Sequence, residues 1–288
     1  MRNLLFLLMI TAVLCVGKGQ DTPVLKPTTE APSKLLQTPI KDGSAILWHL
    51  YHSGFVIKTS HHLLIFDYWP GAEGEPQQKK LANGFIDPAI FKDQNVIVFI
   101  SHEHHDHFYP AALDWRNSIA KIHFIVSPEV VQKDSRYAKK TFVTVLAANK
   151  TATVQDLQIQ TLLATDSGVA FVVKVDGLTI YHSGDHASWN WKNTPAVTTQ
   201  FVSELLKPLA GEKIDIAMHT CDPRLKESDW GGFFAFAKQY QPKLLIPMHF
   251  KSNYAEIQKL PAKIAQEKIT STFWPILSRG GCIIWNGQ

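Results

Sequence analysis

Short apolar runs separated by polar turns dominate the chain from about residue 44 onward. Runs of this length, bounded by Gly, Asp, Asn or Pro, are typical of buried strands. Asp176-Gly177 between two such runs is a favoured two-residue hairpin turn. The pattern predicts strands at 45–49, 54–58, 63–66, 96–100, 121–126, 142–146, 152–154, 157–163, 170–175, 178–182, 214–218, 244–248 and 282–285.

Helical patterns lie mostly in the second half of the chain. They predict helices that begin near residues 88 and 110, and helices over 128–133, 202–209, 233–239 and part of 255–267. Hairpins fill the first half, and strands that alternate with helices fill the second. This order predicts an α+β fold in which two sheets pack face to face with helices outside.

The N-terminal segment reads as a targeting signal. Arg2 precedes an apolar run over 4–16, which is too short to span a bilayer comfortably, and Gly17 and Gly19 follow. We expect a signal peptide over 1–19, a flexible Pro/Thr/Lys-rich leader over 20–43, and one folded domain over 44–288. A lipoprotein acylated at Cys15, or a retained anchor, is the alternative. No later segment is long and apolar enough to cross a membrane, so we expect a secreted or periplasmic protein.

Composition excludes little beyond a nucleic-acid partner. The chain has 288 residues, is 45% hydrophobic and 19% charged, and carries a net charge of +4. No Lys/Arg-rich run occurs, so charge points to no polyanion. Once the signal is removed, Cys221 and Cys282 remain, either as one disulfide or as two buried thiols. Nothing in the sequence indicates an oligomeric state.

The most informative stretch is Ser-His-Glu-His-His-Asp-His-Phe over 101–108, directly after the predicted buried strand 96–100. Histidine and acidic side chains are costly to desolvate unless they are paired or bound to a cation. Imidazole nitrogens and carboxylate oxygens are the donors that divalent transition metals select. A turn here can direct His102 and His104 to one ion, and Asp106 and His107 to another.

Other strand ends carry donors as well. Asp67, Asp185 and His249 each directly follow an apolar run, and Gly184 beside Asp185 allows close backbone approach. Their recurrence alongside the histidine-rich stretch indicates one site that is shared at an edge of the sandwich.

These motifs resemble the metallo-β-lactamase-fold hydrolase superfamily over about residues 45–285. The resemblance rests on Asp67, on the stretch 102–107, on Asp185 within Ser-Gly-Asp, and on His249. The segments 52–54, 165–171 and 222–224 look like the branch that includes ascorbate-phosphate lactonases and N-acylphosphatidylethanolamine phospholipases. The resemblance implies a four-layer αβ/βα sandwich with a metal site at one edge.

The resemblance also implies the roles of individual residues. His102 and His104 would bind the first ion, and Asp106, His107 and His249 the second. Asp185 would bridge the two ions, and Asp67 and His52 would lie behind the ligands.

One departure concerns the first ion, for which the superfamily usually supplies a third histidine. The position that fits here is 165–167, and two alternatives are open: either Asp166 replaces the histidine, or the first site is short of a ligand. We expect two divalent ions, with Zn²⁺ as the first choice. Because an aspartate favours harder ions, Mn²⁺ and Fe²⁺ are the alternatives.

The chemistry expected of such a site is hydrolysis by a metal-bound hydroxide. Asp106 could orient the nucleophile and take its proton. His219, His186 and His52 are candidates for protonating a leaving group or binding an anionic oxygen, and Arg224 for pairing with a phosphate or carboxylate.

The favoured hypothesis is an exported metal-dependent hydrolase that cleaves an ester, lactone or phosphodiester of a small molecule or lipid. Tryptophans near the expected site could line an apolar pocket for such a substrate. A non-catalytic metal- or ligand-binding protein on the same fold, and a β-lactamase proper, are the alternatives.

Overall fold

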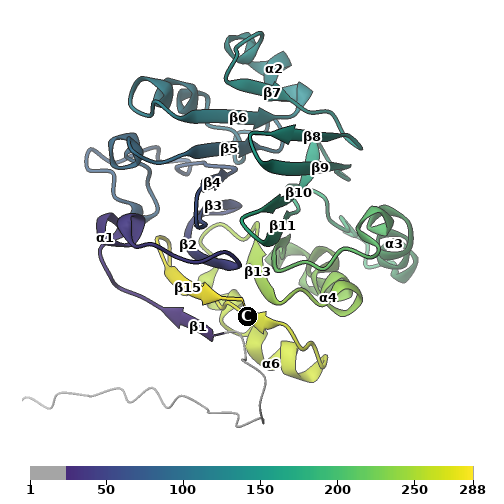
Figure 1. Cartoon of the computed structure of the whole chain (residues 1–288). Helices are drawn as coiled ribbons and strands as arrows, with labels where there is room; N and C mark the ends of the chain where they lie inside the picture. Colours follow the sequence, from purple (N-terminus) through teal and green to yellow (C-terminus); the bar gives the residue numbers. More distant parts are fainter. Residues whose placement is uncertain (1–23, 288) are drawn as a thin grey trace, which may run out of the picture.

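Alternating side chains give the strands of the first sheet two buried faces. In β2 (Ser44–Tyr51), Ala45 and Leu47 face one hydrophobic cluster, while Ile46 and Trp48 face another. The first cluster fills the space between the two sheets and continues beneath the helices that cover the second sheet, and the second cluster lies on the outer face of the first sheet. The computed structural model describes residues 24–287, and Figure 1 shows the two sheets side by side.

The first sheet has eight strands within the described residues. Its spatial order is β1 (Val24–Pro27), β15 (Cys282–Asn286), β2, β3 (Gly54–Lys58), β4 (Leu63–Phe66), β5 (Val96–Ile100), β6 (Ile122–Val126) and β7 (Val143–Val145). Strands β4 to β7 run parallel, so their carboxyl ends lie at one edge.

The second sheet has seven strands in the part that the structure describes. Its order is β14 (Thr272–Phe273), β13 (Leu244–Met248), β12 (Ile216–Thr220), β11 (Leu178–His182), β10 (Val169–Val175), β9 (Leu157–Leu163) and β8 (Thr151–Val154). Strands β11 to β14 are parallel. The predicted hairpin at Asp176-Gly177 joins β10 to β11.

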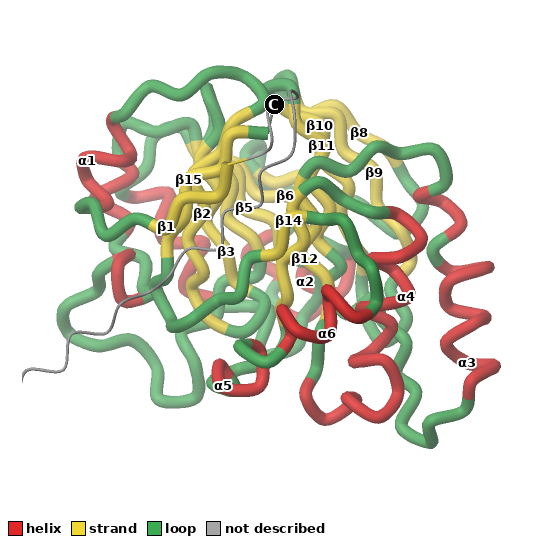
Figure 2. The backbone as a smooth tube through the Cα atoms, turned by 90° about the horizontal axis from the view of Figure 1, so that it is seen from below, coloured by secondary structure: helices red, strands yellow, loops and turns green. Residues whose placement is uncertain are grey.

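Helices flank the two sheets, which occupy the middle in Figure 2. They are α1 (Pro32–Gln37), α2 (Pro128–Lys133), α3 (Pro195–Gln200), α4 (Asp229–Tyr240), α5 (Tyr254–Ile257) and α6 (Leu260–Gln266). Short 3₁₀ turns lie at Leu81–Asn83, Pro88–Phe91, Pro110–Asn117, Ser135–Tyr137, Lys207–Leu209 and Pro223–Ser228, and a π-helical turn at Phe201–Leu205. This is the expected sandwich. No helix among the described residues is long and apolar enough to cross a membrane.

The expectation of a flexible leader over 20–43 is wrong from residue 24 onward. Strand β1 pairs antiparallel with β15, and the short helix α1 buries Leu35 and Leu36 against the outer face of the first sheet. Long-range pairing and two apolar side chains therefore order a segment whose composition alone predicted flexibility. The predicted signal peptide over 1–19 lies outside the described residues.

The two cysteines of the described chain are free thiols. Cys221 is buried in the first of the two hydrophobic clusters, whereas Cys282 packs against the second. Of the two alternatives that the sequence left open, the structure contains the separate thiols.

Candidate metal centre

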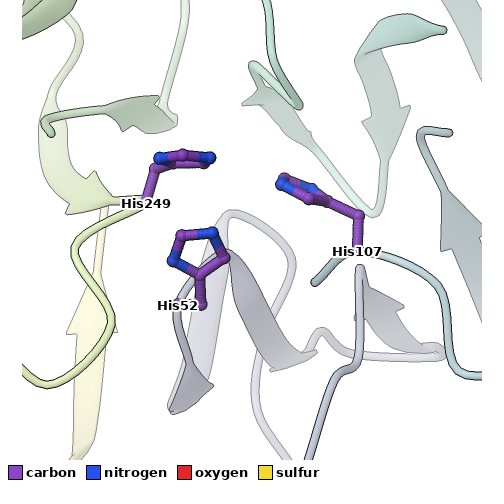
Figure 3. Close-up of side chains that lie close together, drawn as sticks. All are labelled: His52, His107 and His249. Atoms are coloured by element: carbon purple, nitrogen blue, oxygen red, sulfur yellow. The ribbon is translucent and has the colours of Figure 1, made fainter. Parts of the chain in front are cut away.

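Four loops bring histidines and acids to one edge of the sandwich. The loop after β5 carries His107, and the loops after β11 and β13 carry Asp185 and His249. His52 comes from the turn between β2 and β3, and Figure 3 shows its ring below that of His249 and to the lower left of that of His107. The edge is shared because the carboxyl ends of parallel strands lie together.

Asp185 lies at the centre of this group. His107 Nε2 is 3.1 Å and His249 Nε2 is 3.4 Å from its Oδ1, and His102 Nε2 is 3.4 Å from its Oδ2. His102 and His107 are fully buried, and Asp185 is nearly so. The structure thus brings together four residues that the sequence predicted as ligands.

The other nitrogen of each of these imidazoles is already engaged. His107 Nδ1 lies 2.8 Å from Asp67 Oδ2, His249 Nδ1 lies 3.1 Å from Asp222 Oδ2, and His102 Nδ1 lies 2.9 Å from Ser101 Oγ. Hydrogen bonds at Nδ1 fix the ring orientation and leave Nε2 as the lone-pair donor, as is usual in metal sites. Asp67 therefore stands behind His107, where the resemblance placed it.

The arrangement fits a divalent ion. The side-chain atoms His102 Nε2, His107 Nε2 and Asp185 Oδ1 are buried and have no hydrogen-bond partner. Buried polar atoms without partners are rare and costly, so a ligand is needed to satisfy them. Tetrahedral bonds of about 2.0–2.1 Å place neighbouring ligand atoms about 3.3 Å apart, which is close to the separations seen here.

A second group of donors adjoins the first. Ligand atoms of His104, Asp166 and Asp185 all lie within 4.8 Å of one another, and His104 Nδ1 is 3.9 Å from Asp166 Oδ2. The His104 ring also lies against that of His102, with 4.5 Å between the centroids. Asp166 thus occupies the place where the sequence predicted a substitute for the usual histidine.

Asp106 lies on the His52 side of the centre. Its Oδ2 is 3.4 Å from His52 Nε2 and 3.8 Å from Lys251 Nζ. His52 Nδ1 accepts a hydrogen bond of 3.3 Å from the backbone N–H of Lys251, which places the imidazole proton on Nε2. His52 was expected behind the ligands, and one of its ring nitrogens lies within 4.8 Å of donor atoms of His107 and His249.

Burial and charge shift the ionisation of these groups in opposite directions. Burial would raise the pKa values of Asp185 and Asp106. The neighbouring imidazoles of His107 and His249, together with His102 beside Asp185 and His52 beside Asp106, lower both pKa values well below the usual range. Burial lowers the pKa of His52, and the charge of His249 lowers it further. The centre therefore holds carboxylates beside a neutral His52.

Two predicted site residues face elsewhere. The ring of His219 lies 4.5 Å from that of Phe236 in α4, on the outer side of the second sheet. His182 faces the first sheet and is in register with Met218, so the pleat turns His219 outward. The expectation that His219 faces the site is therefore wrong.

His186 is also displaced from its expected role in substrate binding. Its Nδ1 bonds to the carbonyl oxygen of Leu163 at 2.6 Å, and its ring packs against Phe201. Only 1% of the residue is exposed, so it offers no surface to a substrate. The tight turn after β11 sends Asp185 into the centre and His186 into the interior.

Arg224 borders a small pocket beside the centre. The pocket has a volume of about 90 Å³ and is lined by His52, Asp222, Pro223, Arg224, His249, Phe250, Lys251 and Asn253. The Arg224 guanidinium is 61% exposed, pairs with Asp222 and lies over the ring of Trp191. The ring centroids of Trp189 and His249 are 5.3 Å apart, and those of Trp69 and His52 are 5.9 Å apart.

Three contributors were not predicted from the sequence: Ser101, Asp222 and Lys251. Each acts through a residue that was predicted, namely His102, His249 and Asp106. Two sequence features could have indicated these residues: Lys251 lies two positions after His249, and Asp222 follows a buried strand. Only the register of the strands shows which of these side chains reach the site.

Comparison with known proteins agrees with this geometry. A family profile described as a β-lactamase superfamily domain matches residues 46–249. No curated protein matches the chain by sequence.

Solved structures share the fold at low identity. A metallo hydrolase from Ignicoccus hospitalis is 18% identical, with a TM-score of 0.56 over 84% of this chain and 98% of that one. The metallo-β-lactamase fold protein YhfI from Bacillus subtilis is 13% identical, with a TM-score of 0.53 over 85% and 100%. CmlA, a diiron β-hydroxylase from Streptomyces venezuelae, is 11% identical, with a TM-score of 0.52 over 82% and 53%. The fold thus carries more than one chemistry.

Proposed function

Because the chain belongs to the β-lactamase superfamily, we propose that it is an exported metal-dependent hydrolase that cleaves an ester, lactone or phosphodiester bond. The convergence of three imidazole Nε2 atoms on Asp185 is the observation that supports this proposal most directly. Two divalent ions bound there, Zn²⁺ first and Mn²⁺ or Fe²⁺ as alternatives, would supply Lewis acidity and a nucleophilic water at neutral pH.

The residues of the chain have distinct tasks in this proposal. His102, His107, His249 and Asp185 would hold one side of the centre, and His104 and Asp166 the more exposed side. Asp166 is 54% exposed, so this side is open to solvent and to substrate.

Asp106 orients the attacking water. Its carboxylate stays charged because His52, 3.4 Å away, and the surrounding imidazoles stabilise the anion against the cost of burial. His52 Nε2–H and Lys251 Nζ both face Asp106 Oδ2 and fix its direction. Asp106 therefore accepts a hydrogen bond from the water and receives its proton as the bond to the substrate forms.

The pocket favours a substrate with an anionic group. Arg224 and Lys251 both line it, and each can donate charge-assisted hydrogen bonds to a phosphate or carboxylate oxygen. Trp69, Trp189 and Trp191 supply apolar surface next to these cations. A small molecule or lipid that joins an anionic group to an apolar part would match both features, and among the three bond classes a phosphodiester matches best.

A substrate panel tests the proposal. Protein loaded with Zn²⁺ is assayed on a bis-aryl phosphate, an aryl ester, a small lactone and a chromogenic β-lactam, with and without a chelator. We expect chelator-sensitive turnover that is highest for the phosphodiester. The Asp185→Asn variant should lose turnover by at least about a hundredfold, since it removes the shared charged ligand. Asp93→Asn, an exposed aspartate outside the centre, is the matched control and should behave as wild type.

Two outcomes would refute the proposal. Zn²⁺-loaded protein without turnover on any bond class would favour a metal-binding protein without catalysis. Turnover that survives in Asp185→Asn would show that the reaction occurs elsewhere in the molecule. Export has a separate test, which is N-terminal sequencing of the mature protein, with cleavage expected after Gly19.

A further inference from the structure

A second group of imidazoles and carboxylates lies at the opposite end of the sandwich. Strand β3 begins beside His52 and runs away from the centre to the turn that carries His61. Strand β11 runs toward the centre, so the turn before it, which carries Asp176, lies at the far end. Asp42 reaches the same place just before β2. We call Asp42, His61 and Asp176 the distal cluster.

One imidazole nitrogen connects both carboxylates of the distal cluster. His61 Nδ1 lies 3.1 Å from Asp176 Oδ1 and 3.9 Å from Asp42 Oδ1. The three donor atoms lie within 4.8 Å of one another. Ser60 Oγ is 3.0 Å from the same nitrogen and also bonds to Asp42 Oδ1, which adds a fourth donor atom.

The carboxylate of Asp176 is held in place by its other oxygen. Oδ2 accepts hydrogen bonds from Thr59 Oγ1 at 2.5 Å and from the backbone N–H of His61 at 3.0 Å, and lies 3.1 Å from His62 Nδ1. This leaves Oδ1 pointing at His61 Nδ1. The arrangement parallels that of metal sites, in which neighbouring groups orient a ligand through the atom that does not bind the ion.

A positive charge between its carboxylates would stabilise the distal cluster. Two carboxylates face a single ring nitrogen, and a neutral imidazole can donate from Nδ1 or accept there, but cannot do both. Like charges at this separation repel unless a cation lies between them. A metal ion bound between the carboxylates would supply such a charge. The separations bracket the value of about 3.3 Å expected between ligands of one small ion.

We propose that the distal cluster is a further divalent-cation site, separate from the candidate metal centre, with Asp42, His61 and Asp176 as ligands and Ser60 Oγ nearby. One imidazole and two carboxylates are a donor set typical of Zn²⁺, which leaves a position for water. The site is accessible, because His61 is 69% exposed and a hollow of about 360 Å³ borders Asp176.

An ion here would join the two sheets. Asp42 and His61 belong to the first sheet, through the start of β2 and the turn between β3 and β4, whereas Asp176 belongs to the second. Backbone pairing already links them through the hydrogen bond from Gly43 N–H to the carbonyl oxygen of Asp176. Zn²⁺ would add a cross-link at the end of the sandwich that is far from the catalytic chemistry, and its role would be structural.

Metal stoichiometry tests the inference without depending on catalysis. Wild-type protein, His61→Ala and Asp42→Asn are dialysed to equilibrium against Zn²⁺, and the bound metal is measured by elemental analysis. We expect wild type to hold one equivalent more than either variant, whatever number the catalytic end holds. His123→Ala removes a histidine that lies outside the distal cluster and bonds to the hydroxyl of Thr144 at 2.8 Å, and as the matched control it should bind as wild type.

Thermal unfolding supplies a second readout. Zn²⁺ should raise the Tm of wild type and His123→Ala more than that of His61→Ala, because an ion that binds only the folded state stabilises it. Hydrolytic rates of His61→Ala should equal those of wild type. Equal stoichiometry and equal Zn²⁺-induced Tm shifts in wild type and His61→Ala would overturn the inference and leave an imidazolium–carboxylate ion pair. Failure of the hydrolase assay alone would not affect this comparison.

Discussion

The substitution Asp67→Asn is the sharpest probe of how the chain prepares its metal ligands. Asp67 is fully buried and accepts three hydrogen bonds: from Ser101 N–H at 2.8 Å, from Ser101 Oγ at 2.6 Å and from His107 Nδ1 at 2.8 Å. Burial would raise its pKa, but the hydrogen bond from His107 and the charges of His182, His107 and His102 lower it. The carboxylate therefore remains an acceptor toward both of its neighbours.

Asparagine keeps the shape but replaces one acceptor with an N–H₂ donor. If that donor faces His107 Nδ1, the imidazole must accept there, and its proton moves to Nε2. Nε2 is the atom that points at Asp185 and would bind the ion. Loss of a group that orients a ligand costs about 10–100-fold in metal affinity, or about 1.4–2.7 kcal/mol.

Competition with a chromophoric chelator measures the change. Zn²⁺ affinity is determined for wild type, Asp67→Asn and the exposed control Asp93→Asn, and circular dichroism checks that each protein is folded. We expect a loss within the range above for Asp67→Asn and none for the control. A folded Asp67→Asn protein with wild-type affinity would refute the argument that Asp67 selects the tautomer of His107.

Three further predictions follow from individual contacts. Arg224→Ala should raise KM for an anionic substrate by about 5–30-fold with little change for a neutral ester, in steady-state assays of both, because a partly exposed charge-assisted hydrogen bond contributes about 1–2 kcal/mol. Gly168→Ala should lower both Tm and Zn²⁺ affinity, because a Cβ would lie 2.1 Å from the Ser101 carbonyl oxygen and 2.5 Å from His102 Cβ, at a φ of +67°. Acid should destabilise the fold below pH 6.5, because burial lowers the pKa of three histidines that protonate freely only in the unfolded chain. Each of them should lower the free energy of unfolding by up to about 1.4 kcal/mol per pH unit, as measured in urea titrations between pH 7 and pH 4. These histidines, with their pKa values, are His49 at about 3, His186 at about 4 and His219 at about 3.

The sequence predicted the centre of the sandwich because local pattern and global environment agree there. Val96–Ile100 is apolar at every position, and all five residues are buried in β5. A strand that is buried on both faces is apolar at every position, so the sequence predicts it without knowledge of the neighbouring strands. The polar stretch that follows could belong only to a strand end, and this placed His102 and His107 correctly relative to the sheet edge.

The leader shows where that reasoning stops. Val24–Pro27 is only four residues long and ends in proline. Helix α1 contributes only Leu35 and Leu36 to the core. Neither pattern would specify structure in isolation. The hydrogen-bonding edge of β15 and the apolar outer face of the first sheet supply the missing specification. The pairing edge lies more than two hundred positions along the chain from β1.

Strand faces were the other limit. A histidine at the end of a buried strand points either into the site or away from it, and only register decides which. His182 and His219 end neighbouring parallel strands, yet His182 contacts Phe66 between the sheets and His219 contacts Phe236 outside them. His182 is in register with Met218, so His219 lies one position further along its strand and points to the opposite face. The sequence contains no signal of this register.

Burial of an imidazole without a hydrogen-bond partner does not by itself identify a metal ligand. His219 Nε2 is as buried and as unpartnered as His107 Nε2. The difference is in the surroundings: His219 faces aromatic rings, whereas His107 has a carboxylate 3.1 Å from Nε2 and a second carboxylate holding Nδ1. A lone imidazole in an apolar cage is stable when neutral, and burial accordingly lowers the pKa of His219 to about 3. A buried carboxylate surrounded by neutral imidazoles carries a negative charge that must be balanced. The carboxylate at the centre, more than the number of histidines, therefore marks the place where a cation binds.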